Sequence, residues 1–460
     1  MGYMQGIVLF VLLLVCWSPY LLSWLPGGTY SDTNAVIMQA LGHIPLSNRH
    51  TVLYVLLWRF SFWLAGLAGQ GEFAGALVML GIQAVSMAAF ATYCVRWLVE
   101  HGIGKRGCVL VAAFFALCPL VPHYVVAQWK DTIFSISLAY FALCFIDAAM
   151  LKGKPAILAA RVCAGALLVA FTRNNGIYIA LLALAVLVLI HRRRIKAVAV
   201  CLIVPLAACM AFTLAIQGPV YSILGWNVDS TVESLGVPLQ QVARTFAFDG
   251  DMSVEAREYF NSILPGETWN EAYRPFIVDS IKWNGSFNTE RLDHTRGEFL
   301  RCYLETGFRN PLRYLEAFLM SNSGFWDPAV GWAENVAYVN TEISPANPPS
   351  YWQVDAIEAL TGISLRDALE PKVIVSPAVF VWIMLASISV LLVRRRYVLA
   401  AALAPAWGLW LTLLVATPLA YSLRYCFALV LLIPVFVAVQ FGDFSEPGET
   451  MPSSAGTPAG

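Results

Sequence analysis

Charged residues are scarce in this chain. Only 13% of its 460 residues are Asp, Glu, Lys or Arg, whereas 59% are hydrophobic, a balance far from that of a soluble domain. The 29 basic and 29 acidic residues give a formal net charge of zero, so the basic excess typical of a protein that binds nucleic acid is missing. The composition predicts an integral membrane protein surrounded by membrane lipids, with no nucleic-acid partner.

The chain also lacks the spacings of a disulfide framework or a metal site. Nearly all of its ten cysteines lie within apolar runs, and only Cys302 lies in a large polar segment. The histidines at positions 43, 50 and 123 share no metal-ligand spacing. We therefore predict no metal and no other cofactor; a divalent ion is compatible with the sequence, but no cluster of carboxylates supports one.

Long apolar runs, by contrast, are abundant. The first, Gly6 to Leu25, is about 20 residues long, enough to cross a hydrocarbon core. Further runs follow, which together predict an all-α polytopic membrane protein with about ten transmembrane helices. These runs are residues 72–95, 107–125, 132–150, 156–172, 177–190, 197–217, 372–393, 397–415 and 424–441.

Basic residues cluster in every second loop between these runs. By the positive-inside rule such loops are cytoplasmic, which predicts a multi-pass protein of the cell (plasma) membrane with both termini in the cytoplasm. The opposite, exoplasmic side then receives residues 26–71, 122–131, 173–176, 218–371 and 416–424. The basic clusters are Arg96, Lys105 and Arg106; Lys152, Lys154 and Arg161; Arg192 to Arg194 and Lys196; and Arg394 to Arg396.

The segment 51–68 is apolar enough to be read as a further span. Counting it as one would place every later basic cluster outside, so we predict a helix lying along the membrane surface, with Trp58, Arg59 and Trp63 at the interface. A re-entrant helix is the alternative.

The topology divides the chain into four parts. Residues 1–217 form an N-terminal membrane module of about seven spans, whose first exoplasmic loop is 26–71. Residues 218–371 form a mainly helical exoplasmic domain, 372–441 form the last three spans, and 442–460 form a disordered cytoplasmic tail. Within the exoplasmic domain, Ser253 and the Asn310-Pro311 pair predict helix starts.

Four polar groups collect at the predicted exoplasmic mouth of the spans. They are Asp32; Lys130 with Asp131; Arg173 with Asn174 and Asn175; and Arg424. Ionisable groups at membrane depth are costly and mark functional sites by default. An acid among several cations suits a reaction in which a base acts while an anionic group leaves. Sugar transfer from a polyprenyl phosphate is such a reaction.

Each group also has a structural explanation. Asp32 could cap a helix beginning near Thr33, Lys130 and Asp131 could anchor and cap the fourth span, and the arginines could extend to lipid headgroups. The Asp249-Gly250-Asp251 sequence matches a short nucleotide-sugar motif, but we interpret it as a turn. Loop tryptophans could stack on sugar rings, although packing explains them equally well.

Several of these stretches resemble class C glycosyltransferases, the polytopic enzymes that include protein O-mannosyltransferases and the aminoarabinose transferase of lipid A. Ser31-Asp32 follows the first span, and Gly42 to His50 has the pattern G-x-x-P-x-x-N-x-H before an apolar helix. Relatives commonly continue with His-Pro, whereas here Thr51 follows His50. Stretches similar to an uncharacterised bacterial branch are Trp129-Lys130-Asp131, Arg173-Asn174-Asn175-Gly176, Ser234 to Gln241 and Ser422-Leu423-Arg424-Tyr425.

The resemblance implies an inverting transfer of a sugar from a polyprenyl-phosphate donor to an exoplasmic glycan, lipid or protein. In that group the first-loop acid is the base, which corresponds to Asp32; a second acid corresponds to Asp131, and a late arginine that grips the lipid phosphate corresponds to Arg424. We expect Asp131 to support or orient the acceptor. We assign Lys130, Arg173, Arg424 and Tyr425 to the donor phosphate, and Asn48, His50, Asn174 and Asn175 to the substrate lining.

Two other functions fit the same residues. A transporter or flippase of lipid-linked substrates also carries charges near span ends, but it should place polar residues in the middle of several spans, where this sequence is mostly apolar. A polysaccharide polymerase or ligase would share the phosphate chemistry and take an oligosaccharide donor.

Overall fold

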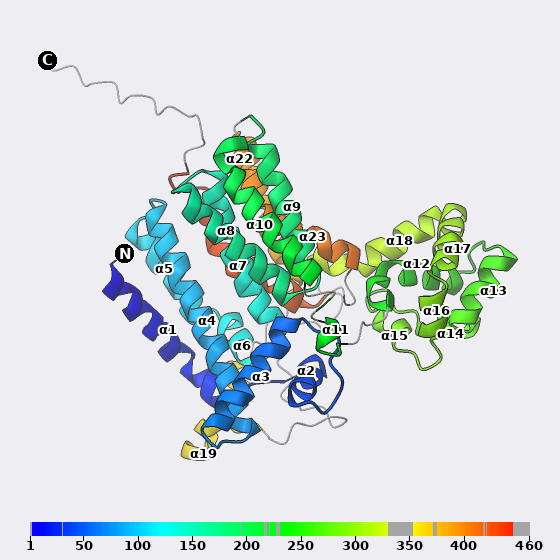
Figure 1. The fold of residues 1–460 in the computed structure, drawn as a ribbon, viewed down its shortest axis with the longest axis horizontal. Coiled ribbons are helices and arrows are strands. Elements are labelled where there is room, and N and C mark those ends of the chain that lie inside the picture. The colour runs from blue at the N-terminus through cyan, green and yellow to red at the C-terminus, as the bar shows by residue number, and fades with distance from the viewer. Residues whose placement is uncertain are drawn as a thin grey trace.

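The structure is a computed structural model, and it describes residues 2–29, 31–193, 195–215, 219, 221–226, 231–329, 353–370, 375–416, 419 and 421–444. Across these residues all regular secondary structure is helical (Figure 1). Strand-like pairing there is limited to three isolated bridges. The prediction of an all-α protein is confirmed for this part of the chain.

Within the described residues, five helices are long and apolar enough to cross a membrane, and a bent pair adds a sixth if it is counted as one span. The members of that pair meet at 46°, with Pro119 in the break between them. The chain is therefore a multi-pass helical membrane protein. The five helices are α1 (Tyr3–Ser23), α4 (Glu72–Glu100), α7 (Lys130–Ala149), α8 (Pro155–Thr172) and α10 (Ile195–Ala215), and the pair is α5 (Lys105–Leu117) with α6 (Leu120–Val126).

The remaining predicted spans form shorter apolar helices, so the prediction of about ten crossings is confirmed only in part. The run 397–415 shows one reason. It is divided at Leu403, and Pro405 occupies the first turn of the second piece, where its missing N–H costs nothing. The shorter helices are α9 (Gly176–Ile190), α21 (Pro377–Val393), α22 (Tyr397–Ala402), α23 (Ala404–Ala416) and α24 (Phe427–Ala438).

Helix α7 lies at the centre of the bundle. It packs against α4, α8, α23 and α24, and side chains such as Phe134, Phe141 and Phe145 are fully buried. An apolar helix of this kind is expected to be surrounded by other helices. Its first turn carries Lys130 and Asp131, so the most enclosed helix delivers two charges to one end of the bundle, which we call the cavity end.

A buried ionic cluster lies at the opposite end of α7. Asp147 accepts a hydrogen bond from Trp97 at 2.8 Å and pairs with Arg161 at 2.8 Å and His101 at 3.2 Å. Trp97 lies in α4, His101 directly follows α4, and Arg161 lies in α8. The cluster therefore joins α4, α7 and α8 at the end of the bundle opposite the cavity end. It keeps α7 in a fixed position within the bundle.

The first residues of the predicted tail 442–460 are packed on this cluster. The ring of Phe444 stacks on His101 with centroids 4.7 Å apart, and the backbone N–H of Asp443 donates to the carbonyl of His101 at 2.9 Å. Residues 445–460, for which we predict disorder, lie outside the described residues.

A second group of helices stands beside the bundle (Figure 1). It has a core of its own, which includes Leu239, Phe246, Phe260, Trp269 and Phe299. We call this group the lateral unit. Its helices are η2 (Thr231–Ser234), α12 (Gly236–Ala247), α13 (Val254–Ile263), α14 (Gly266–Ala272), α15 (Asp279–Lys282), α16 (Thr289–His294), α17 (Arg296–Arg309) and α18 (Pro311–Ser321).

The two predicted helix starts in the lateral unit differ in detail. Ser253 caps α13 as predicted, because its hydroxyl accepts from the backbone N–H of Ala256. Asn310 precedes α18, with Pro311 at the first position, but its side chain does not cap that helix. Instead its amide oxygen accepts from the Asp251 N–H at 2.9 Å and its amide nitrogen donates to the Asp251 carbonyl at 2.6 Å.

The segment after α1 folds over the cavity end. Helices α2 (Ser31–Leu41) and α3 (Val52–Leu67) pack together, and α3 packs on α4, around a third core that includes Trp58 and Trp226. The predicted helix at 51–68 is present as α3, and its position along a membrane surface stays a prediction.

Part of the predicted domain 218–371 returns to the bundle. The short helices α19 (Ala356–Thr361) and α20 (Arg366–Leu369) pack against α1 rather than in the lateral unit. The antiparallel bridge between Leu25 and Val354 holds this return beside the end of α1. Most of the intervening stretch, 330–352, lies outside the described residues.

Candidate functional site

A cavity of about 500 Å³ opens where the cavity end of the bundle meets the lateral unit. Its bundle wall comes from α2, the loop before α3, the start of α7, the α8–α9 turn and η5 (Leu423–Tyr425), and its other wall comes from η2 and α15. Every residue that the sequence singles out as a site residue lines it. These are Asp32, Asn48, His50, Lys130, Asp131, Arg173, Asn174, Asn175, Arg424 and Tyr425.

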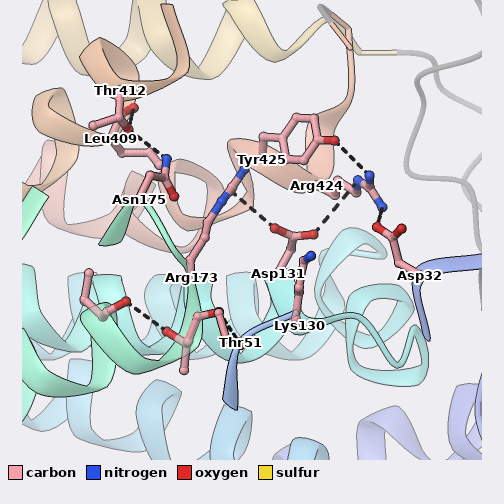
Figure 2. Close-up of polar contacts among 12 residues, drawn as sticks. Asp32, Thr51, Lys130, Asp131, Arg173, Asn175, Leu409, Thr412, Arg424 and Tyr425 are labelled. Atoms are coloured by element: carbon pink, nitrogen blue, oxygen red, sulfur yellow. Dashed lines mark hydrogen bonds and ion pairs between the residues drawn. The ribbon is translucent and has the colours of Figure 1, made fainter. Parts of the chain in front are cut away.

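Two carboxylates alternate with two arginines along the bundle wall (Figure 2). Arg424 Nη1 donates to Asp32 Oδ2 at 3.2 Å, and Arg424 Nε lies 3.9 Å from Asp131 Oδ2. Arg173 Nη1 lies 3.2 Å from Asp131 Oδ1. The Asp131 side chain is 1% exposed and the Asp32 side chain 29%. Asp131 is therefore enclosed between the arginines, whereas Asp32 reaches the cavity.

Tyr425 orients both guanidinium groups. Its ring centroid lies 4.8 Å from Arg173 Cζ and 4.8 Å from Arg424 Cζ, and its hydroxyl accepts from Arg424 Nη2 at 2.8 Å. Cation–π stacking and a charge-assisted hydrogen bond restrict the planar groups to one orientation. An anion bound by these arginines would therefore cost little side-chain entropy.

His50 and Lys130 form a second polar contact in this wall. Burial, and then the charge of Lys130, lower the pKa of His50 to about 3, so its imidazole is neutral near pH 7. His50 Nδ1 lies 3.4 Å from Lys130 Nζ and accepts a hydrogen bond from the ammonium in that form. His50 thus holds the Lys130 ammonium in place.

The charge on Asp32 depends on the same cations. Burial favours its neutral form, but the charges of Arg424 and then Lys130 outweigh burial and hold the pKa of Asp32 below its ordinary range. An anion that bound these cations would weaken their effect and raise that pKa. The strength of Asp32 as a base is therefore coupled to occupation of the cationic part of the cavity.

A tight turn between α8 and α9 positions Arg173. The N–H of Gly176 donates to the Arg173 carbonyl at 2.8 Å, and a Cβ at Gly176 would lie 2.0 Å from the Val169 carbonyl oxygen, so only glycine fits. Asn175 donates to Thr412 of α23 at 3.3 Å and fixes the turn to the bundle. The N-terminus of α9 that follows favours a nearby anion through its dipole.

Gln128 anchors the segment that carries Asp32. Its side-chain amide donates to the carbonyls of Pro26 at 2.8 Å and Ala76 at 3.0 Å, and its backbone carbonyl accepts from the Thr33 hydroxyl at 2.7 Å. Because Thr33 adjoins Asp32, these bonds place the carboxylate beside the start of α7. Sequence reasoning missed Gln128, whose only signal is a polar residue shortly before Lys130.

Gln128→Ala is expected to lower the free energy of unfolding by about 1–3 kcal/mol, because two buried carbonyl oxygens lose their donor. The matched control is Gln70→Ala, since Gln70 is exposed just after α3. Thermal unfolding of the purified protein in detergent measures both. Equal melting temperatures for the two variants would contradict the anchoring role.

The lateral unit supplies a second charged wall. Lys282 is 4% exposed, with Nζ 2.9 Å from Glu233 Oε2 and 3.0 Å from Asp279 Oδ1. Burial opposes its charge, but the two carboxylates outweigh burial and raise the pKa of Lys282. Arg49 reaches across from the bundle wall, with Cζ 4.2 Å from the Trp283 ring centroid and Nε 4.0 Å from Glu233 Oε1. Sequence reasoning missed Glu233, Asp279 and Lys282, because charges in a polar segment carry no signal until the fold brings them together.

Most of the other sequence candidates lie away from the cavity. Asp249 has a φ of 47° in the turn that follows α12, as predicted, and Asp251 pairs with the exposed Arg309 at 3.3 Å. Among the loop tryptophans, Trp283 lines the cavity and Trp269 is buried in the core of the lateral unit; those at 332 and 352 lie outside the described residues. In the part of the chain that the structure describes, no group of three or more His, Cys, Asp or Glu side chains could hold a metal ion.

Fold and site together define the class: a multi-pass helical membrane protein with a charged cavity at one end of its bundle. The chain belongs to a family described as a family of unknown function (DUF6020), whose sequence model matches residues 42–452. The matched region contains the predicted site residues with the exception of Asp32, which precedes it. No curated protein and no solved structure matches the chain.

Proposed function

We propose that this chain is a membrane glycosyltransferase that moves a sugar from a polyprenyl-phosphate donor to a hydroxyl of a glycan, lipid or protein. The observation that carries the proposal is the convergence of ten residues, chosen from distant parts of the sequence, on one cavity in which Asp32 contacts Arg424. In the topology that goes with it, the cavity faces the exoplasmic side of the cell membrane and both termini are cytoplasmic.

The bundle wall suits the donor phosphate. Arg49 of this wall is paired with Glu233 of the other wall. The remaining charges are the three positive ones of Lys130, Arg173 and Arg424 against the two negative ones of Asp32 and Asp131, with His50 neutral, which leaves one net positive charge. Phosphate oxygens match the paired donors of the two arginines. The polyprenyl chain of such a donor would lie in the lipid beside the bundle.

The reaction uses Asp32 as the general base. Its carboxylate takes the proton of the acceptor hydroxyl, whose oxygen attacks the anomeric carbon from the face opposite the phosphate. The bond from that carbon to the phosphate oxygen breaks, its electron pair stays on polyprenyl phosphate, and the arginines and Lys130 stabilise the added charge. The sugar is transferred with inversion, and the proton remains on Asp32 until solvent removes it.

Asp131 has a different task in this proposal. Sequence analysis assigns it to the acceptor, but at 1% exposure, and in ion pairs with Arg173 and Arg424, its carboxylate is placed to orient the arginines. A carboxylate at the start of α7 is also favoured by the helix dipole. We therefore place the acceptor against the other wall.

The wall from the lateral unit suits a hydroxyl-rich, uncharged acceptor. Glu233 and Asp279 are balanced by Lys282 of the same wall and by Arg49, which reaches across from the bundle wall, so these four charges sum to zero. Its carboxylates can accept hydrogen bonds from hydroxyl groups, and the half-exposed Trp283 offers an aromatic surface.

The proposal is tested with the purified protein in proteoliposomes. Polyprenyl-phosphate sugars are supplied one at a time, together with membranes from a host strain that lacks the gene as the acceptor source. We expect one donor to yield a glycosylated product and polyprenyl phosphate in equal amounts. Product formation that is the same without the protein for every donor would contradict the proposal.

A further inference from the structure

Large apolar side chains are exposed in a continuous row on the lateral unit. On α17 they follow one another at intervals of four residues, and on α18 at intervals of three and four, so each set lies on one helix face. We call this row the α17–α18 strip. Its members are Leu300, Leu304, Phe308, Leu312, Leu315 and Leu319, of which Phe308 is 85% and Leu312 72% exposed.

The core of the lateral unit does not need the strip. Helix α17 contributes Phe299 and Cys302 to that core, and α18 buries Tyr314 and Ala317. These side chains point away from the strip, so each helix has two apolar faces and only one is covered. Exposed apolar surface of this extent marks a site of contact with a partner or a membrane.

The strip is continuous with the membrane bundle. Beyond Leu319, the indole N–H of Trp326 donates to the Leu319 carbonyl at 3.1 Å, and the indole N–H of Trp382 donates to the Trp326 carbonyl at 2.7 Å. Trp382 lies in the second turn of α21, and both tryptophans are exposed. Exposed tryptophans near the end of an apolar helix are typical of the level at which a membrane meets water.

The direction of the strip fits the same boundary. In Figure 1, α17 and α18 lie along the upper edge of the lateral unit, and α14 and α15 lie along its lower edge. Helices α8 and α10 extend upward from the cavity end in the same view, so the strip is on the side of the lateral unit that faces the level of these helices. Helix α10 exposes apolar side chains as far as Leu214 near its last residue. Lipid beside α10 would therefore extend to the level of the strip.

The arginines beside the strip are already paired with carboxylates. Arg301 pairs with Glu255 at 2.6 Å, and Arg309 pairs with Asp251 and Glu305 at 3.3 Å each. The surface is thus apolar with a border of paired charges. This arrangement is that of a helix lying in a membrane interface.

We propose that the α17–α18 strip inserts into the lipid interface beside the bundle and holds the lateral unit against the membrane. The lateral unit forms one wall of the cavity, so this contact fixes the height of the cavity above the lipid. A substrate with a lipid tail could then reach the cavity from the membrane. The contact does not depend on the reaction that the cavity carries out.

The test places a photoreactive side chain on the strip. Phe308 and Leu312 are replaced, one at a time, by p-benzoylphenylalanine in the full chain, which is reconstituted in nanodiscs of palmitoyl-oleoyl phosphatidylethanolamine and phosphatidylglycerol. Val254, which is 75% exposed at the start of α13 and outside the strip, is replaced in the same way as the control. After illumination, mass spectrometry measures phospholipid adducts on the protein.

We expect about ten-fold more phospholipid adduct at either strip position than at the control position, as burial of the strip among acyl chains requires. Because all three sites are exposed, the replacements leave the core intact, and size-exclusion chromatography checks this. Equal adduct at the strip and at the control, or no adduct at the strip, would overturn the proposal. So would crosslinks from the strip to a second copy of the chain.

Discussion

Asp32→Asn should lower turnover of a lipid-linked sugar by about 100-fold or more, the effect expected when a general base is removed. The amide keeps the shape of the side chain and its contact with Arg424 but cannot take a proton from the acceptor. The matched control is Asp251→Asn, since Asp251 is 67% exposed in the lateral unit and belongs to the short acidic sequence that we interpret as a turn. Initial rates with saturating donor measure both variants.

The Asp251→Asn control shows whether the reaction uses Asp32 in the cavity or the acidic sequence at 249–251. If Asp32→Asn turns over at the rate of the unchanged protein, Asp32 is not the base. If Asp251→Asn loses as much activity as Asp32→Asn, the acidic sequence at 249–251 takes part in the reaction, and the cavity described here is not the active site.

Asp32 also predicts how the rate depends on pH. Before the donor binds, the cations hold the pKa of Asp32 below its ordinary range. The ratio kcat/KM, which reports the free enzyme, should therefore show no fall near the ordinary carboxyl pKa of about 4. A bound phosphate neutralises Arg424 and raises the pKa of Asp32, so the acid limb of kcat should lie at higher pH than that of kcat/KM. Limbs at the same pH would show that donor binding does not act on Asp32.

Arg424→Gln is expected to lower kcat/KM by about 100- to 1,000-fold. The phosphate that gains negative charge as the sugar leaves would lose the charge-assisted hydrogen bonds of the Arg424 guanidinium. Arg424→Lys should recover part of this loss, since the charge returns without the planar fork that contacts Asp32 and Tyr425. Added polyprenyl phosphate should compete with the donor for the same phosphate site. Its inhibition constant should therefore be higher for Arg424→Gln than for the unchanged protein.

Stability must be followed in the Arg424 variants. Arg424 also faces the buried Asp131, and removing one partner of a buried ion pair can cost about 3–5 kcal/mol. Arg291→Gln, which breaks the exposed pair with Glu298, is the control for loss of a surface arginine. A folded Arg424→Gln variant with unchanged kcat/KM and unchanged inhibition by polyprenyl phosphate would contradict the assignment of Arg424 to the phosphate.

The positions of the site residues could be predicted from the sequence because membrane burial makes charge informative. A charge at the end of an apolar run, such as Asp131 or Arg424, is costly in lipid and must face a partner. The alternation of basic loops then groups these charges at one end of the bundle. The fold places them in one cavity, in the order that lets each carboxylate meet an arginine.

The features of the site that the sequence does not show, such as the roles of Gln128, Glu233 and Lys282, depend on contacts between distant segments. Gln128 bonds the carbonyl of Pro26, about one hundred positions earlier, and nothing in an apolar stretch signals such a partner. Glu233 and Lys282 meet only because the lateral unit folds around its own core. The division of the run 397–415 into two helices has a local origin instead, since Pro405 closely follows the break at Leu403 in a segment whose hydropathy resembles that of a span.

The interior of the bundle bears on the transporter alternative. Between Asp131 and Asp147, α7 presents fully buried Phe134, Phe141 and Phe145 to its neighbours. The buried polar side chains between these two acids are Thr132, Ser135 and Ser137, all in the half of α7 nearer the cavity end, and the charges lie at its two ends. A path for a polar headgroup would require polar side chains along the whole helix. This arrangement supports chemistry at the cavity end over passage through the bundle.

The most direct test of the central claim follows the two halves of the donor separately. A polyprenyl-phosphate sugar labelled with tritium in the sugar and with radioactive phosphorus in the phosphate is supplied to proteoliposomes with the acceptor membranes. A glycosyltransferase separates the labels: tritium moves to an acceptor that is not the donor lipid, and phosphorus stays on polyprenyl phosphate in equal amount. Labels that remain joined, whether the donor stays in place or crosses the bilayer intact, would contradict glycosyl transfer.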